Sequence, residues 1–166
     1  MFELKPLSKD GIEGALAKAE RYRLLNEPGE AESICLDVLE VDPEDQRARI
    51  GLLLALSDQV ADAAGAGARA EKLAAELEGE YDRLYYGGLV AERRGKAHLH
   101  RGGVMTPHGA YEWLTEALTF FDRAGRIRPP GNDDAILRWN ACVRVLRQHP
   151  HLQPGAGAPE EPQFLE

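Results

Sequence analysis

Segments with apolar residues at helical spacing, separated by Pro and Gly, are the feature that most limits the possible folds of this 166-residue chain. Near the N-terminus, for example, Ile12, Leu16 and Ala19 lie three or four positions apart, which places them on one face of a helix. No segment alternates apolar and polar residues as a half-buried strand does. We therefore predict an all-α fold of about seven helices, over residues 9–25, 29–41, 43–57, 61–79, 81–99, 106–126 and 133–148.

Residues with known capping preferences mark where these helices begin. Ser8 is a candidate N-cap for the first helix. Asp42 is a candidate N-cap for the third helix, and Pro43 suits the first helical turn because the amide hydrogen that it lacks has no partner there. Residues 52–56 are all apolar, so we expect the third helix to pack on more than one side.

The overall composition excludes several classes of protein. The 20 Lys and Arg against 28 Asp and Glu give a net charge of −8, which argues against a general nucleic-acid binder because such proteins carry a basic face. No apolar run approaches the roughly 20 residues that a membrane-spanning helix needs, and residues 1–6 do not resemble a secretory signal. The two cysteines are too few for a disulfide framework. We therefore expect a cytoplasmic protein without nucleic-acid or membrane partners.

A repeating unit is visible in the first two predicted helices. Tyr22 supplies an aromatic side chain in the first helix, Ala31 supplies a small side chain in the second, and Asp42-Pro43 ends the unit. With Cys35 in the place of the usual Phe or Tyr, the segment 12–45 resembles a tetratricopeptide repeat, which is a pair of antiparallel helices about 34 residues long.

Two further units follow this pattern less closely. The unit 46–80 lacks the aromatic residue and the closing Pro in its second helix. In the unit 81–131 the positions that match the family are Gly88 in the first helix, Gly95 at the turn, and Ala117, Phe121, Ala124 and Pro129 in and after the second helix. Gly88 and Ala117 are 29 positions apart where the family has about 12, so we expect an insertion near residues 98–107.

The resemblance implies a domain organisation and an architecture. Residues 1–148 would form one tetratricopeptide-like domain, in which three repeats are followed by a capping helix over residues 132–148. Residues 149–166 are rich in Pro and Gly and would form a flexible tail. The helix pairs would stack into a right-handed superhelical array, an α-solenoid.

In this family the first helices of the repeats line a concave groove that binds peptides or protein segments. The positions that the resemblance places there are Leu16, Glu20, Arg23, Arg47, Ile50, Leu54, Tyr85, Leu89, Glu92 and Arg93. This mixture of apolar residues with both signs of charge suits an amphipathic or extended segment. For Leu54 and Leu89, a position in the core is an equally good interpretation.

We therefore expect a non-catalytic adaptor or scaffold that binds a protein segment without a cofactor. No nucleophile elbow or P-loop is present, and neither Cys35 nor Cys142 has a His or a cation beside it in the sequence, so we do not expect an enzyme. A second hypothesis within the same fold is a small secretion-type chaperone for an apolar client segment.

Two further hypotheses remain open. His98, His100 and His108 in or beside the insertion could form an open metal site, which would indicate a metal- or ligand-binding regulator. The chain could also form a homo-oligomer through an uncovered repeat face or through its tail, where Phe164-Leu165 is an apolar anchor in a polar stretch.

Overall fold

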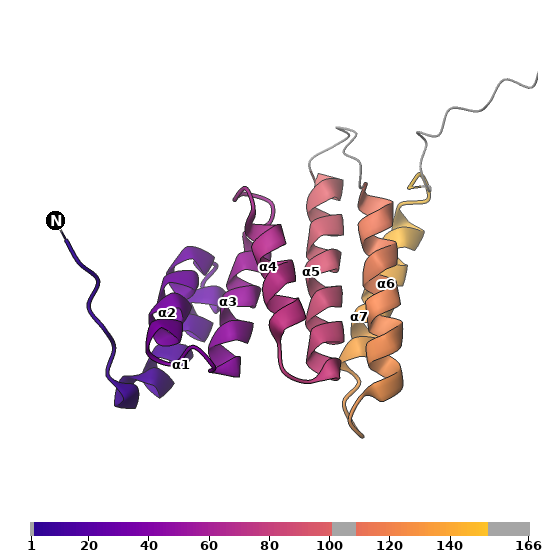
Figure 1. The fold of residues 1–166 in the computed structure, drawn as a ribbon. Coiled ribbons are helices and arrows are strands. Elements are labelled where there is room, and N and C mark those ends of the chain that lie inside the picture. Colours follow the sequence, from indigo (N-terminus) through magenta and orange to yellow (C-terminus); the bar gives the residue numbers. More distant parts are fainter. Residues whose placement is uncertain (1, 101–108, 153–166) are drawn as a thin grey trace, which may run out of the picture.

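The computed structural model describes residues 2–100 and 109–152, and in these ranges the chain is helical with no strand (Figure 1). The all-α prediction is confirmed. A 3₁₀ turn over Lys9–Gly11 precedes helices α1 (Ile12–Leu24), α2 (Pro28–Val41), α3 (Gln46–Asp58), α4 (Ala66–Glu76), α5 (Glu80–His100), α6 (Ala110–Ile127) and α7 (Asp134–Gln148).

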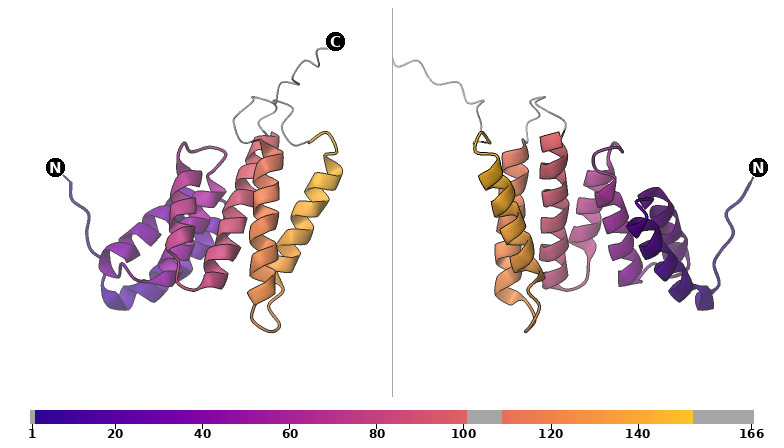
Figure 2. Two further views of the ribbon diagram at one scale, coloured as in Figure 1. Left: turned by 45° about the vertical axis from the view of Figure 1, so that its right-hand side comes forward. Right: turned by 180° about the vertical axis from the view of Figure 1, so that it is seen from behind.

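The helices follow one another along the molecule, so that α1 and α2 lie at one end and α6 and α7 at the other (Figure 2). Each helix packs against the next, and neighbouring helices run antiparallel (Figure 1). In addition, α1 contacts α3, α3 contacts α5 and α5 contacts α7. The odd-numbered helices therefore contact one another in succession along the molecule.

The start of α3 differs from the prediction. The carboxylate of Asp45 accepts hydrogen bonds from the backbone amides of Arg47 at 2.9 Å and Ala48 at 3.0 Å, so Asp45 is the N-cap. Asp42 and Pro43 lie in the turn before the helix, where the Asp42 carboxylate accepts from the amide of Glu44. The prediction that Asp42 caps this helix was wrong, because two acceptors of the same type lie three positions apart and only the second adjoins the first helical turn.

The starts of the first two helices also differ in detail from the prediction. Ser8 precedes the 3₁₀ turn and its side chain makes no capping hydrogen bond. Pro28 is the first residue of α2, a position that tolerates the missing amide hydrogen.

Two large clusters of buried side chains form the core. The first joins helices α1 to α5 and includes Ala31, Cys35 and Leu53, with Tyr22 packed against it. The second joins α5, α6 and α7 and includes Leu114, Ala117, Phe121 and Cys142. Leu54 packs against both clusters and so connects the two halves of the molecule.

Two glycines let α5 and α6 lie very close together. A Cβ atom on Gly88 would lie 2.7 Å from the Phe121 ring, and one on Gly95 would lie 2.8 Å from Leu114 Cγ. Gly95 lies inside the continuous helix α5 and not at a turn as predicted, because the tight contact with Leu114 and not a change of chain direction requires a glycine there.

The predicted insertion and tail fall largely outside the described residues. Residues 98–100 form the last turn of α5, whereas residues 101–107 and the predicted helix start at Thr106-Pro107 are outside the described range. Of the predicted tail, only residues 149–152 are described, as a turn after α7.

Candidate functional site

A pocket of about 440 Å³ lies between α1 and α3, which we call the α1–α3 groove. Its walls include six of the ten predicted groove residues: Leu16, Glu20 and Arg23 from α1, and Arg47, Ile50 and Leu54 from α3. The remaining lining residues are Glu13, Ala17, Ala19, Cys35 and Gly51. Apolar side chains therefore line the interior, and charged side chains from both helices surround them.

Gly51 determines how closely α3 approaches the base of the groove. A Cβ atom at this position would lie 2.9 Å from the Cys35 sulfur, which is too close for two non-bonded atoms. Burial raises the pKa of the Cys35 thiol to about 11, with the charge of Arg23 opposing the increase and that of Asp45 adding to it. The thiol is therefore neutral near pH 7 and acts as an apolar group at the base of the groove, not as a nucleophile.

An ion pair crosses the rim of the groove. Arg47 Nη1 lies 2.7 Å from Glu13 Oε1, which joins α3 to α1, and Arg47 Nη2 lies 3.3 Å from Asp45 Oδ2. The side chains of Arg47 and Glu13 are both exposed. Exposed pairs of this kind contribute at most about 1 kcal/mol, so a partner can replace the Arg47–Glu13 contact at little cost.

A second ion-pair group links three helices at the other end of the groove. Arg23 Nε and Nη2 each lie 2.8 Å from Asp58 Oδ2, and Arg93 Nη2 lies 3.5 Å from Asp58 Oδ1. Asp58 thus pairs with the predicted groove residues of α1 and α5 at once. Two of the three arginines that the sequence placed in the groove, Arg23 and Arg93, are therefore partly neutralised by this shared carboxylate, which the prediction did not include.

The predicted α5 residues Tyr85, Leu89 and Glu92 do not line the α1–α3 groove, and Arg93 reaches only Asp58 beside it. Tyr85 stacks on Tyr81 with ring centroids 5.9 Å apart, and it meets Tyr86 edge to face at 5.1 Å. Leu89 belongs to the buried cluster of α5, α6 and α7, and Glu92 is fully buried. Because α7 packs on this part of α5, Leu89 and Glu92 do not continue the groove.

Glu92 forms a buried ion pair with residues of two helices. Its Oε1 atom lies 2.5 Å from Lys96 Nζ and 3.6 Å from Arg138 Nη1. Its Oε2 atom is buried and has no hydrogen-bond partner among the described residues. The spacing of Glu92 and Lys96, four positions apart, was the one sequence signal for this contact, and nothing in the sequence indicated that Arg138 of α7 completes it.

The predicted histidine site is only partly described. His98 and His100 lie in the last turn of α5, where His100 Nδ1 is 2.7 Å from the carbonyl oxygen of Lys96. His108 lies outside the described residues. Over residues 2–100 and 109–152, no group of three His, Cys, Asp or Glu side chains is placed to hold a metal ion, so the trio stays a prediction.

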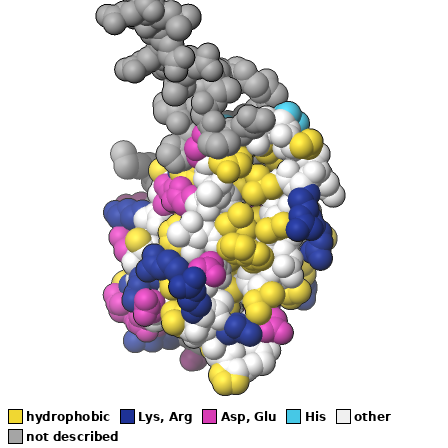
Figure 3. Space-filling view, turned by 90° about the vertical axis from the view of Figure 1, so that its right-hand side faces the viewer, with side chains coloured by type: hydrophobic (Ala, Val, Ile, Leu, Met, Phe, Trp, Pro, Cys, Tyr) yellow, Lys and Arg dark blue, Asp and Glu magenta, His cyan; other side chains and the backbone are white. Residues whose placement is uncertain are grey.

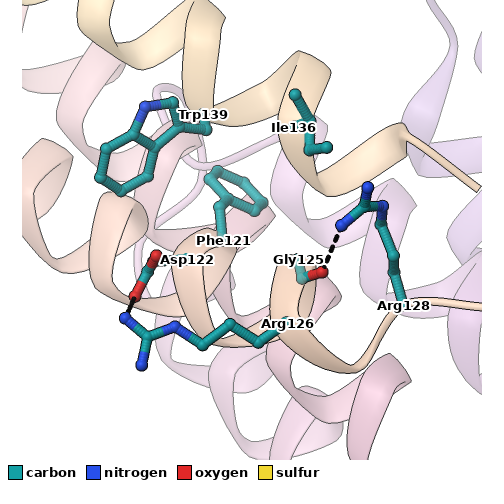
Figure 4. Close-up of a pocket in the computed structure, with 7 residues that line it drawn as sticks. All are labelled: Phe121, Asp122, Gly125, Arg126, Arg128, Ile136 and Trp139. Atoms are coloured by element: carbon teal, nitrogen blue, oxygen red, sulfur yellow. Dashed lines mark hydrogen bonds and ion pairs between the residues drawn. The ribbon is translucent and has the colours of Figure 1, made fainter.

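A pocket that the sequence did not predict lies between α6 and α7, and we call it the end pocket (Figure 4). It has a volume of about 330 Å³ and is lined by Phe121, Asp122, Gly125, Arg126, Arg128, Ile136 and Trp139. Trp139 and Ile136 project from α7 on either side of the Phe121 ring (Figure 4). Their spacing of three positions is that of any packed helix face, which is why the sequence alone could not distinguish them from core.

Comparisons of the chain with protein-family models, curated proteins and solved structures give no match. Separately, none of the helices in the described ranges combines the length and the apolar character that crossing a membrane requires.

Proposed function

We propose that the chain is a tetratricopeptide-like superhelical array that acts as a non-catalytic adaptor and binds an extended or amphipathic protein segment in the α1–α3 groove. The observation that carries the proposal is that six residues chosen from repeat positions in the sequence line one pocket. No cofactor is part of the proposal.

The packing of the helices supports the repeat interpretation. Tyr22 and Ala31 lie in the same cluster, as a small residue between the two helices of a repeat requires. Gly88 of α5 meets Phe121 of α6, which places a small residue opposite an aromatic one in the third pair as well. The contacts between α1 and α3 and between α3 and α5 are those expected when successive pairs stack through their first helices.

The chemistry of the groove supports a protein segment as its ligand. Pockets that bind ligands have volumes of about 300–1,000 Å³, and at about 440 Å³ the groove can accept one or two apolar side chains. Leu16, Ile50 and Leu54 provide the apolar contact surface. Glu20 and Arg47 provide charges of both signs at its edge, which can pair with polar groups of an extended backbone or of flanking residues.

A binding experiment with peptides tests this proposal. Peptides selected against the purified full chain from a displayed random library are synthesised with a fluorophore, and their dissociation constants are measured by anisotropy. Ile50→Glu introduces a charge into the groove and is expected to weaken binding at least about tenfold, the loss of one good apolar contact. Leu36→Glu is the matched control, because Leu36 is an exposed leucine of α2 outside the groove.

The proposal requires that the two variants differ. Circular dichroism and thermal melts establish that both fold as the parent chain does. Peptides that bind Ile50→Glu as tightly as the parent, or a selection that yields no binding peptide, would exclude the α1–α3 groove as the binding site.

A further inference from the structure

The end of the molecule formed by α6 and α7 carries an apolar surface that the described residues leave uncovered. Figure 3 views this end and shows a band of hydrophobic side chains with Lys and Arg on both of its sides. Ile136 and Trp139, which line the end pocket, are each 36% exposed. Large apolar side chains gathered at one surface in this way indicate a contact with another segment.

This end is also the basic part of an acidic chain. Residues 110–152, which contain α6 and α7, carry six Arg against three Asp and two Glu, a net charge of +1, whereas the whole chain has a net charge of −8. In the end pocket, Arg126 pairs with Asp122 at 2.6 Å and Arg128 donates to the carbonyl of Gly125 at 2.7 Å (Figure 4). Arg128 also donates to Asp133 at 3.2 Å. These pairs are solvent-exposed and therefore weak, so both guanidinium groups can take a further acidic partner.

The segment that follows α7 has the complementary composition. Residues 153–166 contain Glu160, Glu161 and Glu166 and no Lys or Arg. Phe164 and Leu165 are the only large apolar residues among them. The segment therefore combines an apolar anchor with negative charge, as the end pocket combines an apolar surface with arginines.

The chain leaves α7 in a position from which this segment can reach the pocket. Leu152 packs against the cluster of α5, α6 and α7, so the chain returns to the helix bundle directly after α7. A helix rises about 1.5 Å per residue, so Ile136 near the start of α7 lies about 20 Å from His149 at its end. Residues 153–164 in the extended conformation that Pro-rich segments favour span about 35 Å at about 3.1 Å per residue.

We propose that residues 159–166 bind the end pocket of the same chain, with Phe164 and Leu165 against Trp139 and Ile136, and with Glu160 and Glu161 near Arg126 and Arg128. A short linker holds the segment at a millimolar effective concentration beside the pocket, so a weak apolar contact is enough for occupancy. The bound segment would cover the apolar end and keep a second molecule from packing on it. This inference does not depend on what the α1–α3 groove binds.

Paramagnetic relaxation measurements on the full chain test the proposal. Gln163→Cys places a nitroxide label next to Phe164, and the native Cys35 and Cys142 are buried and do not compete for the reagent. In ¹⁵N-labelled protein, the amide signals around Ile136 and the indole signal of Trp139 are expected to broaden, while signals of α1 and α2 at the opposite end are unaffected. Replacing Phe164 and Leu165 with Ala in the labelled chain is expected to abolish the broadening.

Two controls distinguish this proposal from binding to a second copy and from a non-specific contact. In a mixture of spin-labelled unenriched chain and unlabelled ¹⁵N chain, broadening of the same signals would show that the segment binds a second copy, and it would overturn the intramolecular proposal. The substitution Ile136→Ser in the labelled chain should remove the broadening and Leu36→Ser should not, because Leu36 is exposed at the far end. Unbroadened α6 and α7 signals in the labelled parent chain would overturn the proposal outright.

Discussion

The guanidinium of Arg23 and the carboxylate of Asp58 form an ion pair with two N–O distances of 2.8 Å, which joins α1 to the last residue of α3. Asp58 also pairs with Arg93 of α5. The first helices of three predicted repeats are therefore connected through one carboxylate, and Arg23 of this group also lines the α1–α3 groove.

We expect Asp58→Asn to lower the free energy of unfolding by about 1–2 kcal/mol, because two arginines lose their common partner in a half-buried setting. The Arg23 and Asp58 side chains are only 23% and 19% exposed. Urea denaturation of both proteins measures the difference. Asp122→Asn is the control: Asp122 also pairs with an arginine, but these side chains are 44% and 74% exposed, and the cost should stay below about 0.5 kcal/mol. Equal losses in the two variants would contradict the importance that we assign to the Asp58 pair.

We expect Gly88→Ala and Gly14→Ala to have opposite effects on stability. An added Cβ at Gly88 would collide with the Phe121 ring at 2.7 Å and should cost about 1–3 kcal/mol through displacement of α5 from α6. At Gly14, inside α1, an added Cβ has nothing within 4 Å, and Ala should stabilise the helix by up to about 1 kcal/mol. Melting temperatures and denaturant midpoints of the two variants measure these changes in stability. A Gly88→Ala variant as stable as the parent chain would mean that α5 and α6 can separate freely.

The contacts of Gly88 with Phe121 and of Gly95 with Leu114 show which parts of the fold could be predicted from the sequence. Helical periodicity gave the number and type of the elements, because each buried face recurs every three to four residues. Repeat spacing singled out Gly88 and Phe121 separately, and the structure shows that they lie against each other. Gly95 was predicted to mark a turn, but it lies inside α5 and allows the close approach of Leu114 from α6. Spacing in the sequence does not separate a turn from a close approach of two helices.

The candidate site shows the same limit. Residues of α1 and α3 were selected together because the resemblance placed both helices at first-helix positions, and the two helices contact each other in the structure. Leu89 and Glu92 of α5 are buried, and their burial involves α7, which follows Glu92 by about 40 positions and whose docking has no local signal in the sequence. The end pocket depends likewise on how α7 meets α6.

We expect the Glu92 and Arg138 side chains to be energetically coupled. Glu92→Gln keeps the size of the side chain but removes the charge opposite Lys96 and Arg138, and should cost about 1–3 kcal/mol. Arg138→Gln removes one of the two cations that pair with the carboxylate among the described residues and leaves Lys96. In a double-mutant cycle measured by urea denaturation, the combined loss should be smaller than the sum of the single losses by at least about 0.5 kcal/mol. Additive losses would show that α5 and α7 are held together by apolar contacts alone.

The two buried thiols predict a specific dependence of stability on pH. Burial raises the pKa of Cys35 to about 11 and that of Cys142 to about 12, and the nearby Glu92 charge adds to the increase at Cys142. The unfolded chain loses these protons at its ordinary thiol pKa near 9, whereas the native chain keeps them. The stability that the protonated thiols contribute is thus complete below pH 9 and is lost as the pH rises through the native values.

Between pH 9 and pH 10 we expect the free energy of unfolding to fall by about 1 kcal/mol for each thiol, since the unfolded thiols ionise while the native ones do not. Urea denaturation at several pH values measures this slope, and the range ends at pH 10 because Tyr86, whose pKa burial raises to about 12, adds a decrease of the same sign above it. Cys35→Ala and Cys142→Ala should each be less stable than the parent at pH 7, but their free energy of unfolding should fall less on going to pH 10.

Thiol labelling gives an independent measurement. In the same pH range the native chain should resist DTNB and react with it only as fast as it unfolds. Rapid labelling of either thiol in the native protein at pH 8, or an unchanged slope in both variants, would show that the two sulfurs are accessible to water.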